Sequence, residues 1–346
     1  MGVMVKKKAS AIFEDSMSHY NAITDIPGIE VGQAQDDEAL TGCTVVLCRQ
    51  GAVGGVDVRG SAPGTRETDL LNPVNLVDRV HAVVLAGGSA FGLDAASGVM
   101  KYLKEQKIGY GFGGSKVPIV PAAILYDLGL GKSARRPDPE MGYAAASTAK
   151  PGPVAEGNVG AGTGATVGKI FGMAGAMKSG LGSASIEIGG GVIVGAIVAV
   201  NAFGDVLDPS TGQILAGARP AQIGPVKLGG GGPFADTLKV MRTPAGRAIL
   251  RLATGGNTVI GVVATNARFD KAQATKVAQM AQDGSARAIR PAHTMLDGDT
   301  IFTLATCQRK ADVSIVGAYA AEVLSQAIVR AVKAAQPAGG LPAINS

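Results

Sequence analysis

A hydroxyl side chain stands at the first residue of an apolar, β-branched run. Gly255-Gly256-Asn257 leads directly into Thr258-Val259-Ile260, so a glycine turn precedes what we expect to be a buried strand. If the Asn257–Thr258 peptide bond breaks, Thr258 gains a free α-amine beside its own hydroxyl, which supplies a base and a nucleophile in one residue. The segment alone is weak support, because Asn-Thr after a glycine turn is also ordinary hairpin chemistry.

Five further polar side chains stand where apolar runs or glycine-rich loops begin or end. Each of them alone fits a turn or a strand end, which is the commoner role for such a residue. Together they would supply one pocket with a cation, an amide donor, two carboxylates and a phenol. They are Lys169 after the glycine loop 160–168, Tyr126 after 122–125, Asn201 after 192–200, and Asp297 and Asp299 before 301–305.

Histidine chemistry fits the sequence poorly. The chain has three histidines, and neither His19 nor His81 has an evident carboxylate partner. His293 has Asp297 close in sequence but no obvious serine or cysteine partner, so a Ser/His/Asp triad or a histidine metal site is hard to assemble. A hydrolase without a usable histidine needs another base, and an α-amine with a pKa near ~8 serves close to neutral pH.

Two familiar motifs are incomplete. The segment 162–170 looks like a phosphate-binding loop, but Thr163 stands where the P-loop needs glycine and Ile170 where it needs Ser or Thr. The segment 87–92 looks like a G-x-S-x-G nucleophile elbow, but Phe91 replaces the second glycine. We therefore expect Ser89 to cap a helix and expect no nucleotide cofactor.

Composition narrows the class of protein. With 46% apolar and 17% charged residues, the 346-residue chain excludes disorder. The net charge is +5, but aromatic residues are only 4% and Trp is absent, which argues against a nucleic-acid partner. The cysteines fit no metal spacing, so we expect reduced thiols, no metal and a cytoplasmic location. The uncharged stretch 188–204 carries five glycines and predicts a buried strand, so we expect no membrane partner.

Strands and helices alternate without a regular βαβ rhythm, and several strands are continuous apolar runs. Such strands are typical of sheets covered on both faces, so we predict layered sheets with helices outside. After a leader of residues 1–20, we predict a single domain over 21–346. The predicted strands are 42–48, 82–86, 192–200, 258–265 and 301–305, and the predicted helices are 91–103, 271–282 and 321–334.

Several ordered segments resemble the DmpA family of self-processing aminopeptidases, which also contains β-aminopeptidases and nylon-oligomer hydrolases. The similarity runs from about residue 20 to residue 335, and the order of the motifs makes it specific for the family. The segments are Thr24-Asp25-Ile26-Pro27-Gly28, Gly157-Asn158-Val159-Gly160-Ala161-Gly162-Thr163-Gly164-Ala165, Gly182-Ser183-Ala184-Ser185, Val200-Asn201-Ala202-Phe203-Gly204-Asp205 and Gly256-Asn257-Thr258.

The resemblance implies an α+β fold, an αββα four-layer sandwich of the type shared with ornithine acetyltransferases and similar to N-terminal nucleophile hydrolases. It implies self-cleavage before Thr258 into an α-chain of residues 1–257 and a β-chain of residues 258–346. It also implies a small peptide or amide substrate, no cofactor, and a tetramer of processed αβ units.

The resemblance also assigns roles to the scattered polar residues. Asn201 corresponds to the asparagine that helps to bind the oxyanion, and Tyr126 matches the active-site tyrosine of the family. Lys169, Asp297 and Asp299 match polar residues around the nucleophile in the nylon-hydrolase branch. The function implied is amide hydrolysis by an N-terminal threonine.

The sequence departs from the family in ways that leave the substrate open. DmpA and the β-peptide-cleaving enzymes use Ser as nucleophile, whereas this chain has Thr258. The threonine, together with the later segment Asp297-Gly298-Asp299, brings the chain nearer to the nylon-oligomer branch. The segments 157–168 and 200–205 instead look like the general peptidases of the family. L-, D-, β-aminoacyl and 6-aminohexanoyl amides therefore all remain candidates, with endo or exo cleavage. The alternatives are an acyltransferase of the ornithine acetyltransferase type and an unprocessed small-molecule binding protein.

Overall fold

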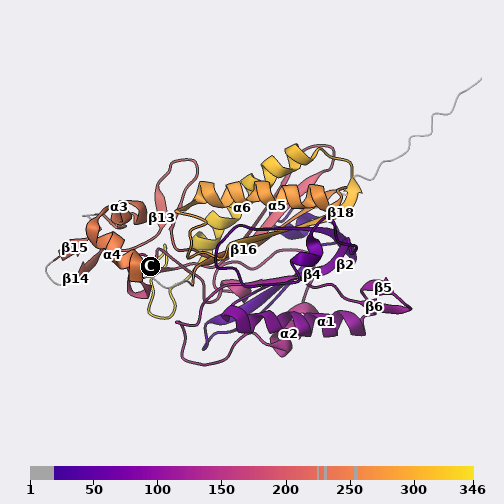
Figure 1. Cartoon of the computed structure of the whole chain (residues 1–346), viewed down its shortest axis with the longest axis horizontal. Coiled ribbons are helices and arrows are strands. Elements are labelled where there is room, and N and C mark those ends of the chain that lie inside the picture. Colours follow the sequence, from indigo (N-terminus) through magenta and orange to yellow (C-terminus); the bar gives the residue numbers. More distant parts are fainter. Residues whose placement is uncertain (1–18, 224–225, 230–231, 253–255) are drawn as a thin grey trace, which may run out of the picture.

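Helices lie on both sides of the central strands of the protein (Figure 1). The computed structural model describes residues 19–223, 226–229, 232–252 and 256–346, so Gly255 and the leader up to residue 18 lie outside the described residues. The helices are α1 (Ala95–Glu105), α2 (Pro139–Ser147), α3 (Thr237–Arg242), α4 (Pro244–Leu252), α5 (Lys271–Ala288) and α6 (Val313–Ala334). Helices α5 and α6 cover one side of the strands, and α1 and α2 cover the other (Figure 1).

Over the described residues, the strands form one nine-stranded sheet and four small ones. The large sheet has the order β10-β11-β16-β18-β2-β4-β7-β3, with β1 paired to β2 off this path. Its strands are β1 (Glu30–Asp36), β2 (Thr41–Val58), β3 (Thr65–Arg66), β4 (Arg79–Ala86), β7 (Ala122–Ile124), β10 (Leu181–Glu187), β11 (Ile193–Asn201), β16 (Thr258–Ala267) and β18 (Thr300–Arg309). The small sheets contain β5 (Tyr110–Phe112), β6 (Ser115–Val117), β8 (Thr166–Val167), β9 (Met177–Lys178), β12 (Asp205–Leu207), β13 (Ile214–Ala216), β14 (Ala221–Ile223), β15 (Val226–Leu228) and β17 (Ile289–Arg290).

Strand β2 divides the large sheet into two layers. On one side, its first part, up to Leu47, pairs with β1, and its last part, from Val53, pairs with β18. On the other side β4 pairs with residues up to Leu47 and again with Ala52 and Val53, and the register shifts between Leu47 and Ala52. A bulged strand bends and twists more than a regular one, which lets a single strand pass from one sheet layer to the next.

Three apolar clusters separate the four layers and confirm the predicted αββα sandwich. One cluster joins α5 and α6 to β11 and β16, and another joins α1 and α2 to β4 and the first part of β2. The third lies between the two sheet layers and takes Leu85 from one layer and Ile260 and Phe302 from the other. Cys43 and Cys48 fall in different clusters, so they point to opposite faces of β2, as their spacing predicts.

The predicted elements are present, with one correction at a helix start. The five predicted strands correspond to β2, β4, β11, β16 and β18, and the predicted helices to α1, α5 and α6. The helix expected from residue 91 begins only at Ala95, after a 3₁₀ turn over Ser89–Asp94. Ser89 does not cap this helix: its φ is 54°, and its backbone N–H donates to the Leu125 carbonyl. A residue in the left-handed region does not start an α-helix.

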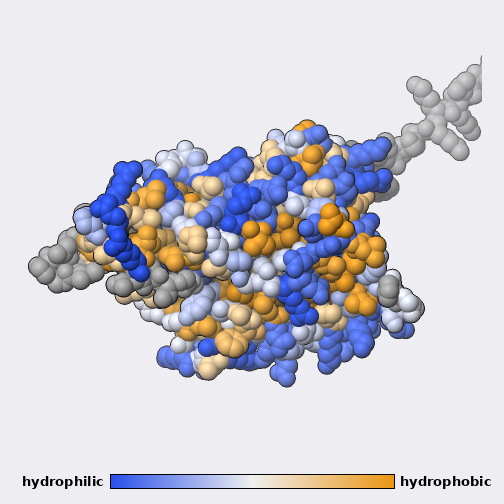
Figure 2. All heavy atoms as spheres, viewed as in Figure 1, coloured by the Kyte–Doolittle hydropathy of each residue, from blue (hydrophilic) through white to orange (hydrophobic). Residues whose placement is uncertain are grey.

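Apolar stretches that suggest a membrane span by length lie in the interior. The uncharged stretch from residue 188 contains a glycine turn and β11, every residue of which is buried. Helix α6 is long and apolar enough to cross a membrane, yet most of its most apolar window is buried inside the molecule, as expected for a core helix. Figure 2 shows hydrophilic and hydrophobic residues interspersed over the face drawn in Figure 1.

Candidate active site

Three strand ends bring the predicted site residues together at one edge of the large sheet. Thr258 is the first residue of β16, and Asn201, the last residue of the antiparallel neighbour β11, lies directly opposite it. Strand β18 runs parallel to β16 on its other side, with Thr300 in register with Ile260. Because parallel strands start at the same edge, the residues just before β18, including Asp299, also lie beside Thr258.

The Asn257–Thr258 junction is buried, and the carbonyl oxygen of Asn257 is contacted from two sides. The Asn257 carbonyl oxygen accepts hydrogen bonds from the Gly298 backbone N–H at 2.9 Å and from Thr258 Oγ1 at 2.5 Å. Asn257 and Thr258 are only 5% and 4% exposed. The hydroxyl therefore stands beside the carbonyl of its own peptide bond, while a backbone donor polarises the same oxygen.

Gly298 is a site residue that the sequence analysis missed. A Cβ at this position would lie 2.4 Å from the Ala62 carbonyl oxygen and 3.0 Å from Thr258 Oγ1. The absence of a side chain thus lets the Gly298 backbone approach the threonine hydroxyl. The signal available in the sequence was a glycine placed between the two predicted acids, Asp297 and Asp299.

Lys169 and Asn201 both donate hydrogen bonds to the carbonyl oxygen of Gly256, the residue before Asn257. Lys169 Nζ lies 2.6 Å from Asn201 Oδ1, 3.0 Å from the Asn201 carbonyl and 3.4 Å from the Gly256 carbonyl. Asn201 Nδ2 donates to the Gly256 carbonyl at 3.2 Å and to the Tyr126 carbonyl at 2.9 Å. The backbone N–H of Thr166 donates to Asn201 Oδ1, which fixes the orientation of the amide.

The three acceptors around Lys169 match the three protons of an ammonium group. Burial lowers the pKa of Lys169 to about 7; the charge of Asp297 opposes this, and the charge of Lys178 adds to it. Lys169 therefore changes its charge close to neutral pH, and in its protonated form it places a positive charge beside the junction.

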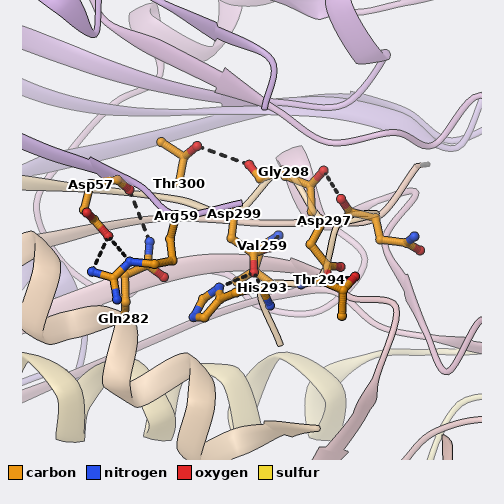
Figure 3. Close-up of polar contacts among 12 residues, drawn as sticks. Asp57, Arg59, Val259, Gln282, His293, Thr294, Asp297, Gly298, Asp299 and Thr300 are labelled. Atoms are coloured by element: carbon orange, nitrogen blue, oxygen red, sulfur yellow. Dashed lines mark hydrogen bonds and ion pairs between the residues drawn. The ribbon is translucent and has the colours of Figure 1, made fainter. Parts of the chain in front are cut away.

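The two predicted carboxylates have different partners. Asp299 accepts from the Val259 backbone N–H at 2.7 Å and lies 2.6 Å from His293 Nδ1 (Figure 3). Asp297 accepts from the backbone N–H and the hydroxyl of Thr294 at 2.8 and 2.6 Å. Burial, together with the charge of Asp299, raises the pKa of Asp297 despite these hydrogen bonds.

Tyr126 reaches the site mainly through its backbone and ring. Its carbonyl accepts from Asn201, and an added Cβ at Gly256 would lie 3.1 Å from the tyrosine ring. The side chain is 44% exposed, and no hydrogen bond of its hydroxyl is seen among the residues described. The family role of the phenol stays a prediction.

A cavity of about 430 Å³ opens beside the junction. Asn257 and Lys169 lie at its wall, and the remaining lining is largely apolar. Asp127 contributes a carboxylate to the cavity wall. This carboxylate accepts hydrogen bonds from Thr41 Oγ1 and the Gly88 backbone N–H, both at 2.7 Å, and burial raises its pKa. The apolar side chains are Leu130, Ile170, Phe171, Met173, Phe203 and Ile249.

The histidines have partners that the sequence did not reveal. His293 lies beside Asp299 and not beside Asp297, its closer neighbour in the sequence. His19 Nε2 lies 3.7 Å from a Glu187 carboxylate oxygen on the surface. His81 Nδ1 accepts from the Ile119 backbone N–H at 3.3 Å. Within the described ranges, no three His, Cys, Asp or Glu side chains are grouped as metal ligands.

A second buried lysine, Lys178, holds the loop that orients Asn201. Lys178 is fully buried, and its Nζ donates to the carbonyls of Thr163 and Ala165 at 2.9 and 2.8 Å. This loop continues into Thr166, which orients Asn201. Burial lowers the pKa of Lys178 to about 7.

Lys178 predicts a pH dependence of stability. Between about pH 7 and about pH 10, the unfolded chain keeps the lysine proton that the folded chain has lost, so the free energy of unfolding rises with pH over this window. In a Thr258→Ala background, urea unfolding should show this rise. Lys178→Met should show a smaller rise, while replacing the exposed Lys132 with Met should leave it unchanged. Equal slopes in all three proteins would contradict the prediction.

Comparison with known proteins identifies the family of the chain. The model of peptidase family S58 matches residues 21–343. An uncharacterized aminopeptidase of Mycobacterium leprae is 43% identical over 357 residues, covering 93% of this chain and 92% of the relative. A 6-aminohexanoate-oligomer endohydrolase of Kocuria sp. is 31% identical over 322 residues, covering 89% of this chain and 85% of the relative.

Solved structures share the fold. A β-aminopeptidase of Burkholderia sp. has a TM-score of 0.64 at 22% identity, covering 94% of this chain and 91% of that one. The L-aminopeptidase D-Ala-esterase/amidase of Ochrobactrum anthropi, described as a variant of the Ntn hydrolase fold, has a TM-score of 0.64 at 21% identity, covering 93% and 88%. With the family match over nearly the whole chain, these findings show that the protein belongs to peptidase family S58 and is a hydrolase of amide bonds.

Proposed function

We propose that the protein activates itself by cleaving the Asn257–Thr258 bond and then hydrolyses amides with the N-terminal Thr258. The observation that carries this proposal is the Asn257 carbonyl, which accepts from both the Gly298 N–H and the Thr258 hydroxyl. A nucleophile, its target carbonyl and a donor for the developing negative charge are thus assembled within one chain.

In the maturation step, Thr258 Oγ1 bonds to the Asn257 carbonyl carbon and the carbonyl oxygen becomes an oxyanion facing the Gly298 N–H. The bond from this carbon to the Thr258 nitrogen then breaks, and the nitrogen takes up the hydroxyl proton as it becomes an amine. The resulting ester joins Asn257 to Thr258 Oγ1. Water hydrolyses the ester, which leaves a carboxyl group on Asn257 and restores the hydroxyl of Thr258.

In turnover, the new Thr258 amine accepts the proton of its own hydroxyl while Oγ1 attacks the substrate amide. The Gly298 N–H and Asn201 Nδ2 are the donors positioned to stabilise the oxyanion. Asn201 and Lys169 now donate to the Gly256 carbonyl, and departure of the 256–257 end would free both for substrate. Asp297 and Asp299 hold the segment that orients Thr258 and favour the ammonium form of its amine.

The cavity supports a proposal for the acyl side of the substrate. Its apolar walls favour an extended, uncharged chain beside the scissile carbonyl. Asp127 is itself buried, and burial raises its pKa, so the cavity offers poor compensation for an ammonium group buried close to the scissile bond. This chemistry favours acyl groups whose charge lies several methylenes away from the carbonyl, as in 6-aminohexanoyl amides.

A panel of p-nitroanilides tests this preference. We expect kcat/KM to be at least ~10-fold higher for hexanoyl and 6-aminohexanoyl compounds than for β-alanyl or glycyl compounds, a difference of ~1.4 kcal/mol. A Leu130→Glu variant should lose much of this preference because it places a new carboxylate at the cavity wall. Higher activity of the wild-type protein on glycyl or β-alanyl compounds would contradict the proposed acyl preference.

The tetrameric assembly, the cytoplasmic location and water as the acyl acceptor stay predictions. Light scattering on the purified protein tests the expected tetramer of processed units, and fractionation of cells tests the cytoplasmic location. Adding a free amine such as ornithine to the hydrolysis assay distinguishes a hydrolase from an acyltransferase. We expect free acid as the main product, and amide transfer to the added amine as the main product would contradict this.

A further inference from the structure

His293 approaches the proposed nucleophile only through a carboxylate. Its Nδ1 lies 2.6 Å from Asp299 Oδ2, and the other oxygen of the same carboxylate accepts from the Val259 backbone N–H. Val259 is the residue after Thr258, so the chain of contacts runs from the imidazole to the first peptide unit of β16 (Figure 3).

The surroundings of this imidazole favour its protonated form. His293 is largely buried, with its side chain 18% exposed, while the Asp299 side chain is 2% exposed. Burial lowers the pKa of His293, but the hydrogen bond and the charge of Asp299 outweigh it and the net pKa is raised. The other ring nitrogen, Nε2, is buried and has no hydrogen-bond partner among the described residues. Arg59 opposes protonation, although its guanidinium is paired with Asp57 at 2.9 Å.

The two acids flanking Gly298 therefore stand in unequal environments. Asp299 faces an imidazole and the Val259 backbone N–H, whereas Asp297 accepts from the hydroxyl and backbone N–H of Thr294 and from the Phe203 backbone N–H.

We propose that His293 is a positioning residue whose imidazole, as a cation, holds the Asp299 carboxylate against the backbone N–H at the start of β16. This placement rests on the contacts of His293 alone. The consequence for catalysis rests on the proposed function of Thr258.

The backbone at His293 offers a conservative variant. Its φ is 55°, a left-handed conformation that asparagine adopts more readily than most residues. The Asn side-chain nitrogen can occupy the place of Nδ1 and donate to Asp299, but it carries no charge. His293→Asn therefore keeps the hydrogen bond and removes the cation, whereas His293→Ala removes both. His19→Asn serves as a matched control, because it removes an exposed histidine beside a carboxylate.

The kinetic test compares rate profiles from pH 5 to 9. We expect kcat of His293→Asn to fall at least ~5-fold below wild type at pH 5.5 and to approach wild type at pH 8.5, with little change in KM. His293→Ala should be slower at every pH, and His19→Asn should match wild type. A His293→Asn profile that superimposes on that of wild type, in a protein that otherwise behaves as proposed, would overturn the inference.

A second measurement does not depend on activity. Because the chain has three histidines, proton NMR of the wild-type, His19→Asn and His293→Asn proteins identifies the imidazole signal of His293. We expect this signal to titrate above the ordinary histidine range, and to move back toward it in Asp299→Asn. An ordinary, unchanged titration would overturn the His293–Asp299 coupling. Activity that survives Thr258→Ala would instead defeat the proposed function and leave this coupling supported.

Discussion

Replacing Thr258 with alanine should keep the protein at full length and abolish amide hydrolysis. Removing the hydroxyl takes away the atom that lies 2.5 Å from the Asn257 carbonyl oxygen, so neither the ester of maturation nor the acyl-enzyme of turnover can form. Loss of such a nucleophile reduces rates by about 10⁶-fold in better-studied hydrolases. Intact mass of freshly purified and of incubated protein should give one species of 34.6 kDa for the variant and two fragments, 1–257 and 258–346, for wild type.

Two variants make this result specific. The Thr258→Ser protein keeps the hydroxyl and should still cleave itself and hydrolyse amides. Thr265→Ala removes a buried threonine from the same strand, where it donates to the Ile193 carbonyl, and should be processed like wild type. Cleavage of Thr258→Ala at the same bond, or a wild-type chain that stays intact on long incubation, would refute the assignment of Thr258.

Replacing Gly298 with alanine should have the second largest effect. The new Cβ would meet the Ala62 carbonyl at 2.4 Å and Thr258 Oγ1 at 3.0 Å, so the 297–299 segment must move and its N–H must leave the Asn257 carbonyl. Loss of one oxyanion donor costs about 10²–10³-fold in rate. We expect self-cleavage to slow by at least that factor, measured on denaturing gels after synthesis in a cell-free system.

A second glycine provides the control for this experiment. A Cβ at Gly111 in β5 would meet nothing within 4 Å, so Gly111→Ala should be processed at the wild-type rate. Circular dichroism and the unfolding midpoint of Gly298→Ala should show that the fold persists. A folded Gly298→Ala protein that divides at the wild-type rate would show that this N–H is not a donor in maturation.

The residues that could be predicted from the sequence are those that interrupt strong local patterns. Asn201 and Thr258 each stand at one end of a long apolar run, and apolar runs are the sequence signal of buried strands. The strands formed as predicted, and the pairing of β11 with β16 placed the two polar ends opposite each other. The four-layer fold came from the family resemblance, since composition indicated only layered sheets.

The parts that were missed depend on pairings between distant segments. Whether His293 meets Asp297 or Asp299 is decided by the turn that precedes β18, and the sequence places Asp297 closer. The importance of the Gly298 N–H appears only when β16 and β18 lie side by side, because a backbone donor leaves no side-chain signal. The left-handed Ser89 likewise follows from contact with the Leu125 carbonyl, which lies on another element.

The place of β16 and β18 in the large sheet has a consequence for the lifetime of the enzyme. Both strands belong to the segment after the junction, and they lie between β11 and β2, which belong to the segment before it. If the bond is cut as proposed, strands of the smaller fragment remain between strands of the larger one and are held by two ladders of backbone hydrogen bonds. A divided protein that unfolds must find its other half by diffusion before it can refold. The lifetime of such a divided protein would therefore be set by its rate of unfolding, so the proposed cleavage would exchange reversible folding for kinetic stability.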